Sequence, residues 1–134
     1  MEKTEKDYCD YDTCVALKEL GYIGQGRHYY DRDKDPNELR HFGVQVLTTR
    51  SAEALNFVLA VHLFDAQKWL REKKNIQIEI PISFMDNGVW KFSFRIQTPE
   101  FYDRALGECD SFEEALLEGI KEAIRILKDG INGN

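Results

Sequence analysis

Two runs of alternating apolar and polar residues, on either side of Asp86-Asn87-Gly88, constrain the fold of this chain more than any other feature. Successive side chains of a β-strand point to opposite faces, so alternation with a period of two gives a strand one apolar face. The pattern therefore predicts an antiparallel hairpin over residues 76–97. Its apolar positions are Ile76, Ile78, Ile80, Ile82 and Phe84 in the first strand and Trp90, Phe92, Phe94 and Ile96 in the second.

The length of the turn decides whether the two apolar faces of this hairpin coincide. A two-residue Asn87-Gly88 turn would place Phe84 opposite Lys91 and the apolar faces on opposite sides. A three-residue loop places Phe84 opposite Trp90, and Gly88 then supplies the left-handed residue of a bulge. Because burial of both apolar faces on one side selects this register, we predict the three-residue loop.

Two helices are predicted from their ends and their apolar faces. The first, over residues 8–20, is capped by Asp10 or Asp12, and Gly21 ends it by adopting the left-handed conformation. The last begins with a capping box, Ser111 to Glu114, and ends at Gly130. Its core face carries Phe112, Leu116, Ile120, Ala123, Ile124 and Leu127.

The stretch over residues 51–74 allows two interpretations. It forms one long helix, or it contains a buried strand over Phe57 to Val61 followed by a helix over residues 63–74. A short apolar run does not separate these by periodicity, and we favour the split. The second half is helical in both, because one face carries Leu63, Ala66, Trp69 and Leu70.

The remaining segments predict strands over residues 27–30 and 42–49 and a charged loop over 31–37. Residues 99–109 are predicted to form a loop anchored by Phe101, Tyr102 and Leu106. We expect one α+β domain over residues 1–134, frayed at 1–7 and 132–134. Its predicted architecture is a two-layer sandwich in which an antiparallel sheet, centred on the 76–97 hairpin, packs against two or three helices.

The charge balance restricts the partners. The chain has 134 residues, a net charge of −6 and a pI near 5.1. Nucleic-acid binding is driven by basic surfaces that neutralise phosphates, so nucleic acid is an unlikely partner. The start of the chain is charged and has no apolar leader, and no run of residues is long and apolar enough to span a membrane. With three cysteines, an odd number, we expect free thiols and a cytoplasmic location.

Several segments together resemble a group of known proteins. They are YDTCVALKELGY near the start, AQKWLREKKNI before the hairpin, and SFEEALLEGIKEAI after it. The combination resembles small uncharacterised proteins of gut Bacteroidales and their mobile elements. The likeness spans most of the chain, and it implies no activity and no catalytic residues.

A second, partial resemblance covers residues 78–127, where an alternating strand, a DNG turn, an aromatic strand and a capped helix follow one another. This order is similar to the HicB-type antitoxin domain, which has a partial RNase H-like fold and neutralises a small RNA-cleaving toxin. The segment over 99–107 is longer than the family's, and no closing strand is predicted after the helix. The matching positions are Asp86, Gly88 and Trp90 at the turn and Ser111, Glu113, Glu114, Ala115, Ile120, Glu122 and Ala123 in the helix.

Three groups of residues are candidates for a metal site or a catalytic site. Zinc takes four converging N or S ligands, and the spacings of Cys9, Cys14, His28 and His41 are not those of a zinc motif. Cys109 with His62 would need an orienting third group to act as nucleophile and base. Asp31, Asp33 and Asp35 alternate with bases, which is typical of a solvated turn rather than a calcium loop. The sequence thus predicts no catalytic residue, no metal site and no cofactor.

A basic cluster is the remaining candidate surface. Residues at the end of the 63–74 helix and on the polar face of the hairpin form a possible anion-binding or partner-binding surface. They are Lys68, Arg71, Lys73, Lys74, Lys91 and Arg95.

The function expected from these features is a non-enzymatic interaction or regulatory domain. Its partner is a protein, either a second copy in a homodimer or a basic protein. One alternative is an antitoxin-like domain that binds a small basic RNA-cleaving toxin. Another is a small ligand-binding domain or enzyme whose site the sequence does not reveal.

Overall fold

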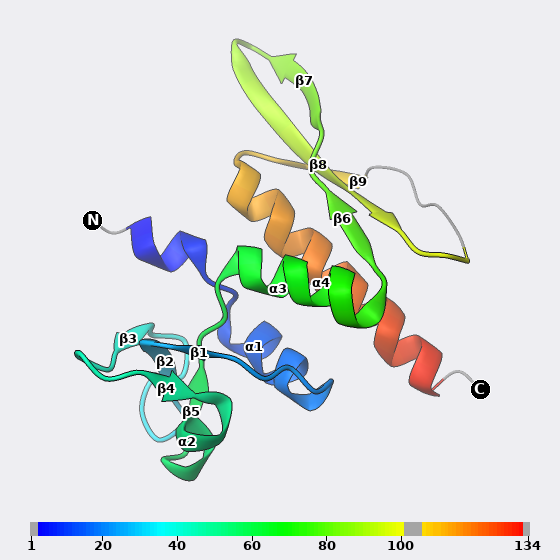
Figure 1. Cartoon of the computed structure of the whole chain (residues 1–134). Helices are drawn as coiled ribbons and strands as arrows, with labels where there is room; N and C mark the ends of the chain where they lie inside the picture. Colours follow the sequence, from blue (N-terminus) through cyan, green and yellow to red (C-terminus); the bar gives the residue numbers. More distant parts are fainter. Residues whose placement is uncertain (1–2, 101–105, 133–134) are drawn as a thin grey trace. The chain divides into compact units, whose positions relative to one another are not determined.

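The computed structural model describes residues 3–100 and 106–132 (Figure 1). Its contacts form two compact units, one ending at His62 and one beginning at Leu63. Both units combine helices with small antiparallel sheets, so the predicted α+β class is confirmed. The single domain over residues 1–134 stays a prediction.

The first unit contains two small antiparallel sheets. One has the strand order β3-β2-β5, and β1 pairs with β4 in the other. Residues 3–7 form a short 3₁₀ helix, so the predicted fraying at 1–7 is wrong for these residues. The elements are η1 (Lys3–Asp7), α1 (Tyr11–Glu19), β1 (Gln25–Gly26), β2 (His28–Asp31), β3 (Arg40–His41), β4 (Leu47–Thr48), α2 (Thr49–Ala54) and β5 (Phe57–Leu59).

Helix α1 has the predicted cap and closing glycine, but it begins at Tyr11, so the predicted start at residue 8 is wrong. A carboxylate oxygen of Asp10 accepts a hydrogen bond from the backbone N–H of Thr13 at 3.0 Å, which is the N-cap interaction. At the other end Gly21 has φ +106°, and the N–H of Tyr22 donates to the carbonyl of Leu17 at 2.9 Å. These are the features of a Schellman motif, which closes the carbonyls left open by the last turn.

The strand predicted over residues 42–49 is confirmed only for β4 and is wrong over residues 42–46. A turn containing Gly43 at φ +90° lies between β3, which precedes the predicted range, and β4, which falls within it. Val44 is 85% exposed and Val46 is 48% exposed. The apolar residues that suggested a strand therefore have no neighbouring layer to pack on, and the left-handed glycine breaks the extended chain.

The split interpretation of residues 51–74 is confirmed. Thr48 and Ser51 form a capping box at the start of α2, and Asn56 at φ 64° separates this helix from β5. The buried Val58 and Leu59 of β5 pair with β2.

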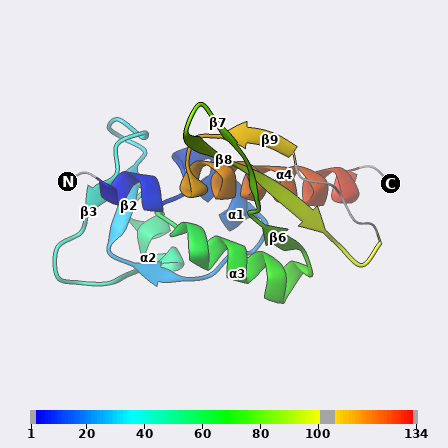
Figure 2. The same cartoon turned by 90° about the horizontal axis from the view of Figure 1, so that it is seen from above.

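The second unit is a sheet covered by helices. β8 pairs antiparallel with β6, β7 and β9. Helix α4 runs along β8 and lies beside α3 (Figures 1 and 2). The elements are α3 (Leu63–Lys74), β6 (Gln77–Glu79), β7 (Ile82–Asp86), β8 (Val89–Gln97), β9 (Leu106–Cys109) and α4 (Phe112–Asn132).

The core of this unit joins the predicted apolar face of the hairpin to the helices. The predicted layering of an antiparallel sheet on helices is therefore confirmed for the second unit. The buried residues include Leu63, Ala66 and Leu70 of α3, Ile78, Phe94 and Ile96 of the sheet, and Leu116, Ile120 and Ala123 of α4.

The start of α4 is as predicted, and its end is not. The hydroxyl of Ser111 accepts from the N–H of Glu114 at 3.1 Å, and the Glu114 carboxylate accepts from the N–H of Asp110 at 3.1 Å. Gly130 does not end the helix, which continues to Asn132. Among the residues that the structure describes, the left-handed glycines are Gly21, Gly43 and Gly88, so Gly130 lacks the backbone conformation that closes a helix.

The loop predicted over residues 99–109 is wrong in its last part. Residues 106–109 form β9, in which Leu106 lies opposite Phe94 and Cys109 opposite Phe92. The predicted anchors Phe101 and Tyr102 lie outside the described residues. Four residues are too few to show an alternating pattern in the sequence. They form a strand because they pair with the backbone N–H and C=O groups at the free edge of β8.

The predicted three-residue hairpin loop is also wrong. Asn87 at φ 52° and Gly88 at φ 79° form a two-residue turn, with Phe84 opposite Lys91. Two left-handed residues in sequence are typical of the type I′ turn, which Asn-Gly favours.

The apolar faces coincide as far as Ile82, because the extra residue lies elsewhere, whereas Phe84 shares the face of Lys91 and departs from the prediction. The register shifts between Ile82 and Phe84, and Ile82 lies opposite Phe92 as predicted. A β-bulge at Ser83 therefore produces the predicted pairing of Ile82 with Phe92, in place of the extra residue predicted in the turn. Pro81 precedes the bulge, at the break between β6 and β7, and its carbonyl accepts from the N–H of Ser93 at 3.2 Å.

Replacing Gly88 with valine tests the turn. Gly88→Val is expected to lower the free energy of unfolding by about 1 kcal/mol or more, because a β-branched residue resists positive φ. Urea denaturation measures the difference. Gly26→Val, at a glycine without positive φ whose new Cβ would lie 3.8 Å from Leu59, is the control. Equal losses in the two variants would contradict the turn assignment.

Candidate functional site

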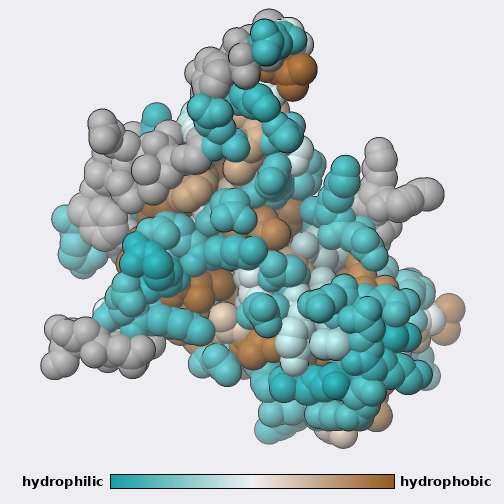
Figure 3. All heavy atoms as spheres, turned by 180° about the vertical axis from the view of Figure 1, so that it is seen from behind, coloured by the Kyte–Doolittle hydropathy of each residue, from teal (hydrophilic) through white to brown (hydrophobic). Residues whose placement is uncertain are grey.

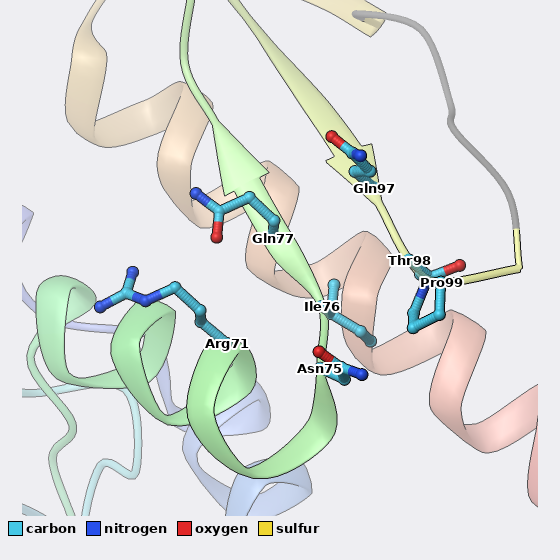
Figure 4. Close-up of a pocket in the computed structure, with 7 residues that line it drawn as sticks. All are labelled: Arg71, Asn75, Ile76, Gln77, Gln97, Thr98 and Pro99. Carbon is cyan, nitrogen blue, oxygen red and sulfur yellow. The ribbon is translucent and has the colours of Figure 1, made fainter.

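A recess of about 310 Å³ lies where α3 leads into β6, beside the end of β8 (Figure 4). Asn75, at φ 60°, makes the tight connection from the helix to the strand. Gln77 and Gln97 are direct cross-strand partners and present two amides on one face of the sheet. The lining residues are Arg71, Asn75, Ile76, Gln77, Gln97, Thr98 and Pro99.

The lining is suited to a small polar or anionic group. Three amide side chains offer both donors and acceptors, and the exposed Arg71 adds one positive charge. Arg71 is therefore the predicted anion-surface residue that the structure places in a recess. No sequence pattern indicated the glutamines, because they become neighbours only through the pairing of β6 with β8.

The other basic residues fall into two groups, one on α3 with Arg71 and one on β8. Lys68 and Lys73 are exposed on α3, and the ammonium of Lys74 lies 5.5 Å from the ring centre of Trp69. On β8, the Lys91 ammonium lies 2.5 Å from a carboxylate oxygen of Asp110, and Arg95 lies 3.3 Å from Glu79. These pairs offset the charge of the hairpin residues, so the basic potential is concentrated on α3.

The outer end of the β7–β8 hairpin is apolar and exposed. Val89 is 52% exposed and Trp90 is 50% exposed, whereas Ile96, farther along β8 on the same face as Trp90, is fully buried. In Figure 1 the hairpin extends beyond the start of α4, and Figure 3 shows apolar surface at this end. The predicted burial of Trp90 is therefore wrong, because α4, which covers the sheet, does not extend over the outer end of the hairpin.

A cluster of rings in the first unit contains all three histidines of the chain. The hydroxyl of Tyr8 and Nδ1 of His28 are 3.0 Å apart, and the ring centres of Tyr8 and His62 are 5.3 Å apart. The rings of His28 and His41 lie 4.9 Å apart on paired strands. Burial, followed by the nearby His41, lowers the pKa of His28. Sequence reasoning missed Tyr8 and His62 as members of this cluster.

The cysteines that were weighed with these histidines lie in the core instead. The thiol of Cys14 donates to the carbonyl of Cys9 at 3.5 Å and accepts from the N–H of Val61 at 3.3 Å. The hydrogen bond with Cys14, followed by burial, raises the pKa of the Cys9 thiol. Within residues 3–100 and 106–132, no three His, Cys, Asp or Glu side chains are grouped so as to hold a metal ion.

Cys109 and His62 belong to different units. Burial, followed by Glu114 and Glu118, raises the pKa of the Cys109 thiol. This direction is opposite to the activation expected from a helix N-terminus, so the thiol is a poor nucleophile.

The alternating aspartates shape the loop that they begin. Asp31 accepts from the N–H of Asp33 at 2.9 Å, and Asp35 accepts from the N–H of Asn37 at 3.0 Å. Asp33 accepts from the side-chain amide of Asn56 at 3.0 Å. Two of these carboxylates accept hydrogen bonds within the turns, and the third binds Asn56, the residue before β5. Such contacts are typical of a structural loop.

Tyr30 links stability to alkaline pH. Its hydroxyl donates to the carbonyl of Cys9 at 2.7 Å, and burial, followed by Cys14, raises the pKa of Tyr30. An unfolded tyrosine loses its proton near pH 10, whereas folded Tyr30 keeps it, so stability is expected to fall as pH rises above about 10. Tyr30→Phe is expected to cost about 1 kcal/mol at pH 7 and to weaken this pH dependence. Urea denaturation across this range gives both values, and an equal alkaline slope in the two proteins would contradict the assignment.

Searches against protein-family models, curated proteins and solved structures each found no match to this chain. None of the helices among the described residues has the length and apolar character needed to cross a membrane.

Proposed function

We propose that this chain is a protein-binding domain that contacts its partner through the outer end of the β7–β8 hairpin. The observation that carries the proposal is the exposure of Trp90 at that end, where the next residue, Val89, is also exposed on the other face of the strand. Tryptophan is among the residues that contribute most to protein interfaces, because it buries a large rigid area and also donates a hydrogen bond. The domain acts by binding rather than by catalysis, in a cytoplasmic setting.

The partner favoured for this surface is a second copy of the chain. Two hairpin ends that meet would remove two tryptophans and two valines from water, and the free strand edges nearby would extend the contact. A specific dimer needs an interface of at least about 1,000 Å² in total. The apolar end must therefore be joined by neighbouring parts of the second unit.

Sedimentation of wild-type protein and Trp90→Ser at micromolar concentration tests this proposal. Wild type is expected to be a dimer and Trp90→Ser a monomer with a similar melting temperature, because Trp90 is half-exposed in the monomer. Val44→Ser, an exposed apolar residue of the first unit, is the matched control and is expected to remain dimeric. A monomeric wild type, or a dimeric Trp90→Ser, would contradict the homodimer.

A small basic protein is the second candidate partner. The net charge of −6 favours it, because opposite charges speed association. An antitoxin-like role would be supported by a neighbouring gene for a small RNA-cleaving protein whose toxicity is relieved by wild type and not by Trp90→Ser. The recess at Arg71 supports the remaining alternative, binding of a small polar ligand.

A further inference from the structure

The pairing of β2 with β3 places the imidazole rings of His28 and His41 directly opposite each other. His28 and His41 are direct partners in this antiparallel ladder. In the next pair, the N–H of Phe42 donates to the carbonyl of Arg27 at 2.7 Å. Hydrogen-bonded and non-hydrogen-bonded pairs alternate, so His28 and His41 form a non-hydrogen-bonded pair, in which side chains lie closest.

The surroundings of His28 match those of a metal ligand. The Tyr8 hydroxyl lies 3.0 Å from Nδ1 of His28 and fixes the orientation of the ring. Ligating histidines commonly use one ring nitrogen for such a partner and the other for the ion. Tyr8 therefore leaves Nε2 of His28 for coordination.

His41 is exposed, and this gives an ion access from solvent. Its Nδ1 accepts from the N–H of Gly43 at 3.1 Å. Coordination through Nε2 moves the ring proton to Nδ1 and breaks this bond, but the groups are exposed and water replaces the lost partner. The positive charge of Arg40, next to His41 in the chain, is offset by Glu38 at 3.0 Å.

We propose that His28 and His41 together bind a divalent transition-metal ion of the zinc, nickel and copper class. Neutral imidazole is a favoured ligand for these ions, and water fills the remaining positions. Cys9 and Cys14 are buried in the core, where Cys14 is hydrogen-bonded to Val61 and Cys9, so these two thiols do not complete a tighter site. The ion binds to a surface that is already folded, and the affinity is below that of a four-ligand structural zinc site.

Zinc titration of the untagged full chain, followed through the histidine ring signals in NMR, tests the site. The chain has three histidines, so three ring signals report on it. Zn²⁺ alone is expected to shift the signals of His28 and His41 and to leave that of His62 in place. Single His→Gln variants assign the signals.

Calorimetry with Zn²⁺ gives the second readout. His41→Gln is expected to weaken binding by at least about tenfold, a loss typical of disrupting a metal site. His62→Gln is the matched control and is expected to bind as wild type does. Melting temperatures show that each variant is folded. Wild-type affinity in folded His41→Gln, or an equal shift of the His62 signal, would overturn the proposal.

Discussion

Gly119→Leu is expected to lower the free energy of unfolding by about 3 kcal/mol, at the upper end of the usual cost of overpacking a core. Gly119 faces the sheet from α4. A Cβ at this position would lie 2.8 Å from Cγ2 of Ile78 and 3.2 Å from Cβ of Phe94. Both neighbours are buried side chains with no space to withdraw into, so helix and sheet must separate to admit leucine.

The same substitution elsewhere in α4 gives the matched control. A Cβ at Gly130 meets no described atom within 4 Å. Gly130→Leu is therefore expected to stabilise the protein by roughly 0.5–1 kcal/mol through helix propensity alone. Urea denaturation compares the variants. A loss at both positions, or at neither, would contradict the close approach of α4 to β6 and β8.

Leu17→Ala is expected to destabilise the first unit by roughly 2–5 kcal/mol, the usual cost of the cavity left by a buried leucine. Leu17 is fully buried on α1. Leu55→Ala, at an exposed position of the same unit, is the control and is expected to change stability by less than about 0.5 kcal/mol. Denaturation followed by circular dichroism measures both.

The same variant tests the expectation of one domain. Both tryptophans, Trp69 and Trp90, lie in the second unit, so their fluorescence reports on that unit alone. If the chain unfolds as one domain, Leu17→Ala lowers the fluorescence midpoint as much as the circular dichroism midpoint. An unchanged fluorescence midpoint would show that the two units unfold independently and would contradict the single domain.

Features with local causes follow from the amino-acid sequence alone. The Asp10 and Ser111 caps, the left-handed Gly21 and the positive φ of Gly88 were all predicted, because each depends on a few neighbouring residues. The alternation over 76–97 determined which hairpin face joins the helices, since a period of two leaves one apolar side. The division of residues 51–74 into a buried strand and the helix α3 was also predicted.

The tertiary structure decided what depends on partners distant in the chain. It placed the extra residue of the hairpin at Ser83 instead of in the turn, since a bulge and a longer loop correct the register equally well. It made residues 106–109 a strand, because β8 had a free edge, and it left residues 42–46 as a turn without a covering layer.

The candidate sites were decided in the same way. The three histidines and Tyr8 are far apart in the sequence. The pairing of β2 with β3 brings the rings of His28 and His41 together. The bridge between Tyr8 and His62 brings those two residues together. Trp90 has the same place in the alternation as the buried Ile96, and it is exposed because α4 begins too late to cover it. Sequence periodicity assigns a side chain to a face, and the length and position of the covering element decide whether that face is buried.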